Sequence, residues 1–357
     1  MGHLFIPGPV DVDPEIAAEQ TRAMLPHRSA QFEEIFRRAS ENAQKLFFTK
    51  YRVFISASSG TGFHEAAVRN FVNQDVLCCV NGAFAERWKQ VAESNGKQTD
   101  VLAADWKEPI TPERVKEALS HKKYEAILVV HNETSTGLVN PVKEIAAVVK
   151  QVSPDTLICV DAVSSLGGDK IEMDAWGLDM VLTSAQKALA LPPGIALAAV
   201  SDRAMAKAEQ VANRGWYFDL VRMEKHRLKD STPATPAIGL VYALDKQLER
   251  MLAEGLEARF ERHAAMAELT RGWATSRGLE LYAPEGYRSQ TVTTIDNKLG
   301  IDVSKLNAFL SERGMRIANG YGQLKNLTFR IGHMGELTLT DMEELLAAMD
   351  DFLQNAA

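Results

Sequence analysis

The sequence predicts an α/β protein, with a mostly parallel sheet covered by helices in a large domain and a smaller α/β domain towards the C-terminus. Three observations lead to this fold class. Short apolar runs alternate with amphipathic helical stretches through the first two thirds of the chain, which is typical of a parallel sheet with helical connections. The chain has 357 residues, which is longer than a chain that folds around a single hydrophobic core usually is. Its pattern changes around residues 235–236.

Six short apolar runs, each followed by a polar or glycine-containing turn, are expected to form strands. They lie at residues 53–55, 75–80, 126–130, 157–160, 180–183 and 195–200. A helix is expected within residues 32–47, because apolar side chains recur there at helical spacing and form one stripe. Such a stripe belongs to the core and does not indicate a cofactor site.

The last third opens with Thr235 and Pro236, an N-cap residue followed by a proline at the first helical position. This pair predicts the start of a long helical region, which Gly255 interrupts. A domain hinge is expected near the pair. The chain then divides into an N-terminal arm, a large domain and a small domain, at residues 1–13, 14–250 and 251–357.

Within the small domain, strands are expected at residues 291–295 and 327–331. The last helix is expected to open with a capping box formed by Thr340 and Glu343. In the second strand the odd positions are apolar, so Arg330 lies on the opposite face. That arginine therefore faces either water or a binding site.

Charge and hydropathy exclude several classes of partner. Forty basic and 47 acidic side chains give a net charge of −7, and no basic block occurs, so neither nucleic acid nor an anionic membrane is expected as a partner. The apolar runs are much shorter than the roughly 20 residues of a membrane-spanning helix. Cys78, Cys79 and Cys159 lie inside apolar runs, as buried reduced thiols do. With no secretory signal visible, the cytoplasm is the expected compartment.

Three histidines do not indicate a metal site. His64, His131 and His333 lack the spacing of a helical zinc motif or of a cysteine and histidine cluster. No bound metal is therefore expected.

A glycine-rich segment, residues 58–62, follows a predicted strand and precedes a helical stretch at 63–72. Glycines allow close approach to the backbone, and the free amides and dipole of a helix N-terminus attract phosphate. The segment is neither a dinucleotide fingerprint nor a Walker loop. An ordinary strand-to-helix turn is the alternative interpretation.

Two ionisable residues end the following strands of the predicted sheet. Asp161 closes the run at 157–160, and Lys187 follows the run at 180–183; functional groups collect beyond the carboxyl ends of such strands. A buried carboxylate needs a partner, which could be a helix cap, a salt bridge or a protonated pyridine nitrogen. A desolvated lysine is a nucleophile suited to Schiff-base chemistry, although a solvent-facing lysine is the ordinary case. Phosphate cradle, carboxylate and lysine together match the shape of pyridoxal phosphate.

The runs VDAVSSLGG, TSAQKALALPPG, VNGAFAERW, HNETSTG and PGPV resemble those of class V aminotransferases of pyridoxal phosphate fold type I. The likeness is greatest to alanine–glyoxylate and serine–glyoxylate (serine–pyruvate) enzymes, and it extends from Pro7 to the last helix. The resemblance implies that pyridoxal 5′-phosphate is the cofactor. It also implies a pyridoxal-phosphate-binding large domain at residues 14–250.

The resemblance implies roles for individual residues. Lys187 matches the lysine that forms the Schiff base and then shuttles a proton, and Asp161 matches the carboxylate that keeps the pyridine nitrogen protonated. Other positions match cofactor contacts: Ser59, Gly60, Thr61, Phe84, Thr134, Val163 and Gln186. Substrate contacts are implied for Gly8, Ser165 and Arg330, of which the arginine would grip the α-carboxylate.

Thr232 and Thr235 match a site at which the neighbouring subunit reaches the cofactor phosphate. The resemblance therefore implies a homodimer with shared active sites. Some relatives have tyrosine in place of Thr232, which makes Thr235 the firmer expectation.

The expected function is transamination from a small amino donor, alanine or serine, to glyoxylate or pyruvate. Within the same fold the alternatives are a phosphonate or phosphoserine transaminase, a lyase or an epimerase. A cysteine desulfurase is disfavoured, because that activity needs a cysteine near the small domain and this chain has none after Cys159. From a different class, the chain could be a non-catalytic binding or structural subunit, but Lys187, Asp161 and Arg330 argue against it.

Overall fold

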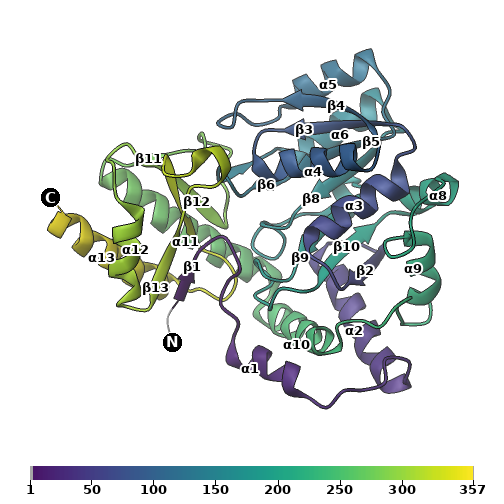
Figure 1. Ribbon diagram of the computed structural model, residues 1–357, viewed down its shortest axis with the longest axis horizontal. Coiled ribbons are helices and arrows are strands. Elements are labelled where there is room, and N and C mark those ends of the chain that lie inside the picture. The colour runs from purple at the N-terminus through teal and green to yellow at the C-terminus, as the bar shows by residue number, and fades with distance from the viewer. Residues whose placement is uncertain (1–2, 357) are drawn as a thin grey trace.

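The computed structural model describes residues 3–356. Within them the chain forms a large and a small α/β unit, which lie side by side in Figure 1. The large unit is built on a seven-stranded sheet of order β2-β10-β9-β8-β5-β3-β4. In that order the strands are Arg52–Ser56, Ala196–Val200, Met180–Ser184, Leu157–Asp161, Ala126–Val130, Asp75–Val80 and Gln98–Ala103.

Strand directions confirm the expected fold class. β4, β3, β5, β8 and β9 pair in parallel, whereas β10 is antiparallel to both β9 and β2. All six expected strands are present. β4 was not expected from the sequence because it is an edge strand in which no residue is fully buried, so it needs no apolar run.

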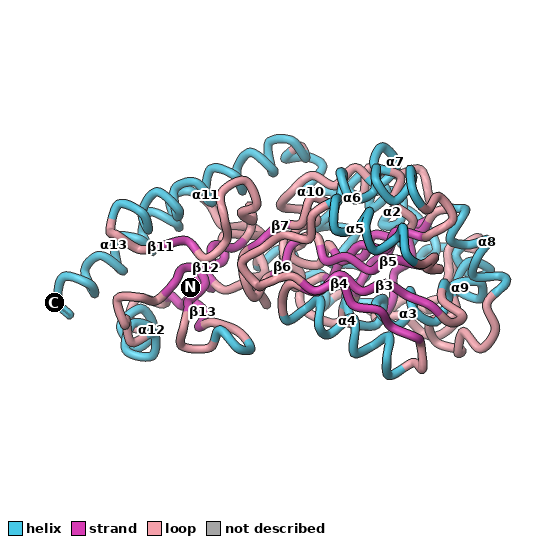
Figure 2. The backbone as a smooth tube through the Cα atoms, turned by 90° about the horizontal axis from the view of Figure 1, so that it is seen from above, coloured by secondary structure: helices cyan, strands magenta, loops and turns pink. Residues whose placement is uncertain are grey.

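Helices cover both faces of this sheet, as Figure 2 shows. Apart from those of β4, alternate residues of each strand belong to two separate cores: Val53 and Ile55 belong to one, and Phe54 to the other. The first core includes side chains of α2, α5, α6, α7 and α10, which span Ala30–Leu46, Pro112–His121, Val142–Val152, Met173–Trp176 and Ile238–Glu254. The second includes α3, α4, α8 and α9, which span Gly60–Phe71, Ala83–Ser94, Asp202–Gln210 and Leu220–Arg227.

The small unit contains a five-stranded sheet, counted within residues 3–356, of order β1-β13-β14-β12-β11. These strands are His3–Phe5, Met315–Asn319, Thr328–Gly332, Val292–Asp296 and Glu280–Leu281. Side chains of three helices complete its core: α11, α12 and α13, which span Leu256–Ser276, Val303–Ser311 and Leu339–Ala356. No helix in the described part of the chain has the length and apolarity that crossing a membrane requires.

The N-terminal segment connects the two units. β1 pairs in parallel with β13 of the small sheet, and a few residues later the Val10 N–H donates to the Gln186 carbonyl of the large unit, at 3.2 Å. A short helix, α1 (Pro14–Ala18), follows. The division at residues 1–13, 14–250 and 251–357 remains our proposal, with β1 of the arm added to the sheet of the small domain.

Several local expectations were wrong. Thr235 does not cap α10, which begins two residues after Pro236 with Ala237 at the cap position and no side-chain cap. The last helix begins at Leu339.

Its cap also differs from the expected one. Thr338 and Asp341 exchange hydrogen bonds there, so the reciprocal pair lies two residues before the expected Thr340 and Glu343. Leu327, expected as the first residue of a strand at 327–331, is 62% exposed and precedes β14.

The break at Gly255 is confirmed, since this residue has φ +89° and separates α10 from α11.

Candidate active site

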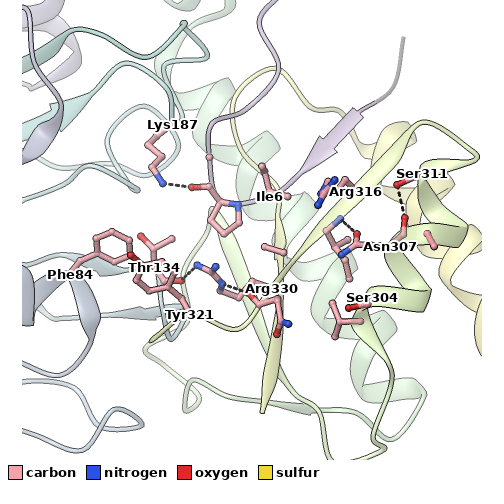
Figure 3. Close-up of a pocket in the computed structure, with 17 residues that line it drawn as sticks. Ile6, Phe84, Thr134, Lys187, Ser304, Asn307, Ser311, Arg316, Tyr321 and Arg330 are labelled. Carbon is pink, nitrogen blue, oxygen red and sulfur yellow. Dashed lines mark hydrogen bonds between the residues drawn. The ribbon is translucent and has the colours of Figure 1, made fainter. Parts of the chain in front are cut away.

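A cavity of about 640 Å³ lies where the large unit, the small unit and the N-terminal segment meet. Figure 3 shows side chains from all three around it. Among the predicted site residues, those that line the cavity are Gly8, Phe84, Thr134, Lys187 and Arg330. The fold therefore brings together groups separated by more than 300 positions in the sequence.

Lys187 lies in the loop after β9, and its Nζ donates a hydrogen bond to the Pro7 carbonyl. Burial, followed by the positive charge of Arg330, lowers the pKa of this lysine to about 8. Gly8 has φ +106°, and a Cβ there would lie 2.6 Å from Cδ of Lys187. Glycine is required at this position for the N-terminal segment to pass so close to the lysine.

Asp161 ends β8 and is 4% exposed. One carboxylate oxygen accepts the Val163 N–H at 2.7 Å, and the other lies 2.7 Å from Nε2 of His64. The sequence predicted burial and the need for a partner, and His64 is a partner that it did not identify. That histidine lies 97 positions away, and its sequence context gave no signal for the pairing.

The glycine segment forms the start of α3, as expected for a phosphate cradle. Gly60 is the first helical residue, and a Cβ there would lie 2.5 Å from Cγ2 of Val163. Ser59 provides no side-chain cap, and within residues 3–356 the buried Oγ of Ser58 has no hydrogen-bond partner. The first amides of α3 are therefore not occupied by a side-chain cap, and the Ser58 hydroxyl is also free to bind. Both would be available to an incoming phosphate.

Gln186 is held in a way that leaves its amide nitrogen available. The Ser184 hydroxyl donates to its Oε1 at 2.6 Å. The NH₂ group therefore remains as the donor end for an anionic ligand. This observation and the uncapped start of α3 agree with a phosphate-bearing cofactor.

Arg330 lies on β14, whose strand residues are all buried, and is itself 8% exposed. Its guanidinium donates to the backbone carbonyls of Asn319 and Thr134, at 3.1 and 3.2 Å. Burial lowers its pKa to about 10. It forms no ion pair with any residue between 3 and 356. The sequence left open whether this arginine faces water or a site; it faces the cavity.

Phe84 is positioned by a buried carboxylate at the start of α4. Glu133, in the short strand β6 (Asn132–Glu133) that pairs with β7 (Leu138–Val139), accepts the N–H groups of Phe84 and Ala85 at 3.1 and 3.0 Å. Burial raises the pKa of this glutamate. On the cavity side, Tyr321 stacks on Phe84, with ring centroids 5.4 Å apart. Sequence reasoning identified neither Glu133 nor Tyr321.

Ser165, Thr232 and Thr235 are three of the nine predicted residues that do not line the cavity. Ser165 is buried, hydrogen bonds with Nδ1 of His131 at 2.8 Å, and does not line the cavity. Thr232 and Thr235 lie beside a separate small hollow, together with Trp216 and Tyr217. The hydroxyl of Thr232 donates to the Ala234 carbonyl at 2.6 Å. A single chain therefore does not bring these two threonines to Lys187.

The arrangement is that of an enzyme whose cofactor is a phosphorylated aldehyde with a basic ring nitrogen. A lysine of lowered pKa, a buried carboxylate and an uncapped helix N-terminus fit the aldehyde, ring nitrogen and phosphate of such a cofactor. The model of the aminotransferase class V family matches residues 15–333. The chain belongs to this family and is a pyridoxal-phosphate-dependent aminotransferase.

Related proteins match this chain over almost its full length. The chain is 38% identical to an uncharacterized aminotransferase of Methanocaldococcus jannaschii, covering 97% of this chain and 90% of the relative. It is 34% identical to an L-aspartate–glyoxylate aminotransferase of Paracoccus denitrificans, with 94% and 87% covered. It is 32% identical to a serine–glyoxylate aminotransferase of Methylorubrum extorquens, again with 94% and 87% covered.

A solved structure confirms the fold. The crystal structure of an aspartate aminotransferase of subgroup IV from Thermus thermophilus superposes with a TM-score of 0.92 at 30% identity, covering 99% of each chain. Both the parallel sheet of the large unit and the smaller C-terminal unit therefore belong to a known aminotransferase architecture.

Proposed function

We propose that this enzyme transfers the amino group of a small amino acid, alanine or serine, to a small 2-oxo acid, glyoxylate or pyruvate. The observation that carries the proposal is the shared cavity of Lys187 and Arg330. A carboxylate bound by the arginine would hold the α-amino group of the same molecule on the side of the lysine. A guanidinium without an ion pair in residues 3–356 is well suited to that carboxylate.

When bound, pyridoxal phosphate supplies an aldehyde that accepts an amino group and a ring that stabilises negative charge at Cα. Lys187 would act on the aldehyde as a neutral amine and later move a proton at Cα, which its lowered pKa permits. Asp161 would hold a proton on the ring nitrogen. Arg330 would fix the substrate carboxylate.

The cofactor site that we propose contains nine of the predicted residues, all from the large unit. The carboxylate, the lysine and the amide are Asp161, Lys187 and Gln186. The remaining cofactor contacts are Ser59, Gly60, Thr61, Phe84, Thr134 and Val163. The cavity position of Gly8 supports a role in shaping the substrate site, and Ser165 remains a sequence-based prediction.

A homodimer with shared active sites is part of the proposal. Thr235 is exposed, and the neighbouring Trp216 and Tyr217 are 52% and 44% exposed. Exposed aromatic side chains of this size are typical of interfaces. Thr232 and Thr235 would then reach the cofactor phosphate of the partner subunit. The buried free thiols of Cys78, Cys79 and Cys159 favour a reducing compartment, and we propose the cytoplasm.

Aspartate is a second candidate donor. Arg316 lies on β13 and lines the same cavity as Arg330, and it makes no ion pair within the described residues. Ala318 pairs with Arg330 across the two strands, and Arg316 is two positions earlier on the same face of its strand. A second arginine on that face would donate to the side-chain carboxylate of such a donor.

A panel of donors and acceptors tests the proposal. The purified protein, supplied with pyridoxal phosphate, is incubated with alanine, serine or aspartate and with glyoxylate or pyruvate, and both products are quantified. We expect equal amounts of the new amino acid and the new oxo acid. Arg316→Ala should depress turnover of aspartate and spare that of alanine. Ammonia release or racemisation without an acceptor would indicate a lyase or an epimerase instead.

A further inference from the structure

His64 is the buried partner of the carboxylate that we assign to the ring nitrogen. Its Nε2 lies 2.7 Å from Oδ2 of Asp161, and the two residues are 2% and 4% exposed. Oδ1 of Asp161 accepts the Val163 N–H, also at 2.7 Å. Two donors from different segments therefore fix the carboxylate in one orientation.

The imidazole itself has little freedom. It stacks on the indole of Trp88, with ring centroids 4.5 Å apart and 15° between the planes. The indole N–H donates to the backbone carbonyl of His64 at 3.2 Å, and Trp88 is 1% exposed. The packing of α4 against α3 thus determines where Nε2 points.

The other ring nitrogen of His64 indicates that Nε2 is the donor in this contact. Within residues 3–356, the buried Nδ1 of His64 has no hydrogen-bond partner. A proton on Nε2 points at the Asp161 carboxylate and leaves Nδ1 as one weak acceptor without a partner. A proton on Nδ1 instead would bury an unpaired N–H and set the Nε2 lone pair against a carboxylate oxygen, which is the more costly arrangement. Nε2 is therefore the donor in this contact.

His64 also links the two ends of the cofactor site. It lies four residues after Gly60, one turn into the helix whose N-terminus forms the proposed phosphate cradle. The helix that would hold the phosphate thus also holds the carboxylate that would face the ring nitrogen. This coupling depends on the side chain at position 64.

We propose that His64 is a positioning residue for cofactor binding: its Nε2–H fixes the Asp161 carboxylate so that a lone pair faces the ring nitrogen of pyridoxal phosphate. The inference rests on the proposed cofactor site. Loss of a hydrogen bond to a charged group should weaken cofactor binding about 10-fold or more.

The test compares two polar substitutions of different reach. The amide nitrogen of glutamine reaches the position of Nε2, whereas that of asparagine reaches only the position of Nδ1. His64→Gln should bind the cofactor within about threefold of the wild type, and His64→Asn and His64→Leu about 10-fold or more weakly. The ¹⁵N chemical shift of ring-labelled pyridoxal phosphate should move in the last two variants and not in the first. Thermal melting of each variant identifies any that fail to fold.

His333→Gln is the matched control. His333 is also fully buried, with Nε2 2.9 Å from the Thr293 hydroxyl, but it does not line the cavity. This variant should leave cofactor affinity and the ¹⁵N shift unchanged.

Two results would overturn the inference: wild-type affinity and ¹⁵N shift in His64→Asn, or failure of a folded His64→Gln to restore them. Absence of cofactor binding by the wild type would reject the cofactor site and this inference together. Cofactor binding without transamination would count against the proposed function alone.

Discussion

The ring of Tyr321 lies stacked on the ring of Phe84, with centroids 5.4 Å apart and an angle of 15° between the planes. Phe84 belongs to the large unit and Tyr321 to the small one. The Tyr321 hydroxyl also accepts a hydrogen bond from Arg87 at 3.1 Å, and the Arg330 guanidinium lies 5.5 Å from the tyrosine ring. One side chain therefore connects the aromatic residue predicted to cover the cofactor with the arginine predicted to bind substrate.

Removal of the Tyr321 ring should weaken substrate binding more than cofactor binding. In Tyr321→Ala, Arg330 loses the ring that lies on one side of its guanidinium. The stacking of Tyr321 on Phe84, which contributes about 0.5–1.5 kcal/mol beyond the effect of buried area, is lost as well. We expect a KM for the amino donor several-fold higher and a cofactor Kd close to that of the wild type. Tyr321→Phe keeps the ring and should behave almost normally. A large loss of cofactor from Tyr321→Ala would contradict this assignment.

Attachment of the cofactor should depend on the ionisation of Lys187. Its neutral form is the nucleophile, and its pKa is about 8, so the rate of attachment to the apoenzyme should rise with pH up to about 8 and level off above. Arg330 lowers this pKa, so Arg330→Ala should move the inflection to higher pH. Stopped-flow absorbance measures both profiles, and an inflection that moves down would refute the coupling.

Lys187→Ala should be soluble and inactive. After borohydride reduction of the wild type, peptide mapping should find the pyridoxyl group on Lys187. A pyridoxyl group on a different lysine would end the assignment.

Asp161→Asn should reduce transamination by orders of magnitude. The substitution keeps the size of the side chain but removes the charge opposite the ring nitrogen, and stabilisation of developing charge by one good contact is worth roughly 3–4 kcal/mol. Single-turnover kinetics with alanine measure the effect. A kcat near that of the wild type would show that this carboxylate has no such role.

Arg330→Ala should raise the KM for amino donors roughly 30-fold or more, because a buried charged hydrogen-bonding pair broken on one side costs about 2–5 kcal/mol. Arg330→Lys keeps the charge but loses the two-pronged geometry, and should fall in between. Bound cofactor and its absorbance should persist in both. Amines without a carboxylate serve as the control, since their turnover should hardly change. The hypothesis would be falsified if the KM for alanine and serine stayed constant.

The proposed dimer predicts an effect of Trp216 on assembly. Trp216→Glu places a charge on a surface that we expect to be covered, which should favour monomers at low protein concentration. Analytical ultracentrifugation measures the shift, and cofactor affinity should fall with it if Thr235 reaches the partner's phosphate. Substitution of the exposed Leu299, which is 61% exposed and belongs to the small unit, is a control. A dimer unaffected by Trp216→Glu would place the interface elsewhere.

The sequence by itself predicted the central strands and the ionisable residues that follow them. Strands buried on both faces must be apolar throughout, so the runs leading to Asp161 and Lys187 stand out from their surroundings. Ionisable residues directly after such runs are placed at the carboxyl edge of the sheet by the topology itself. The family motifs then identified the cofactor, which the matched family model confirms.

Features that depend on partial exposure or on local competition could not be predicted in this way. β4 is an edge strand without a fully buried residue, so hydrophobic patterning did not reveal it. Thr338 and Thr340 are both acceptable caps, and in the structure the hydroxyl of Thr338 accepts the Asp341 N–H at the start of α13. Leu327 is apolar yet exposed, because the buried strand β14 begins one residue later.

Tertiary structure alone decided which polar groups meet. Hydrophobic periodicity reports which side of an element faces a core, but it contains no information about which distant side chain comes within hydrogen-bonding distance. His64 reaches Asp161 because α3 packs beneath the end of β8, and Arg330 faces the cavity because β14 lies in a sheet that the N-terminal segment joins to the large unit. The sequence thus determined which strands are buried and which ionisable residues follow them, and the packing of the helices and of the two units determined the partners of those residues.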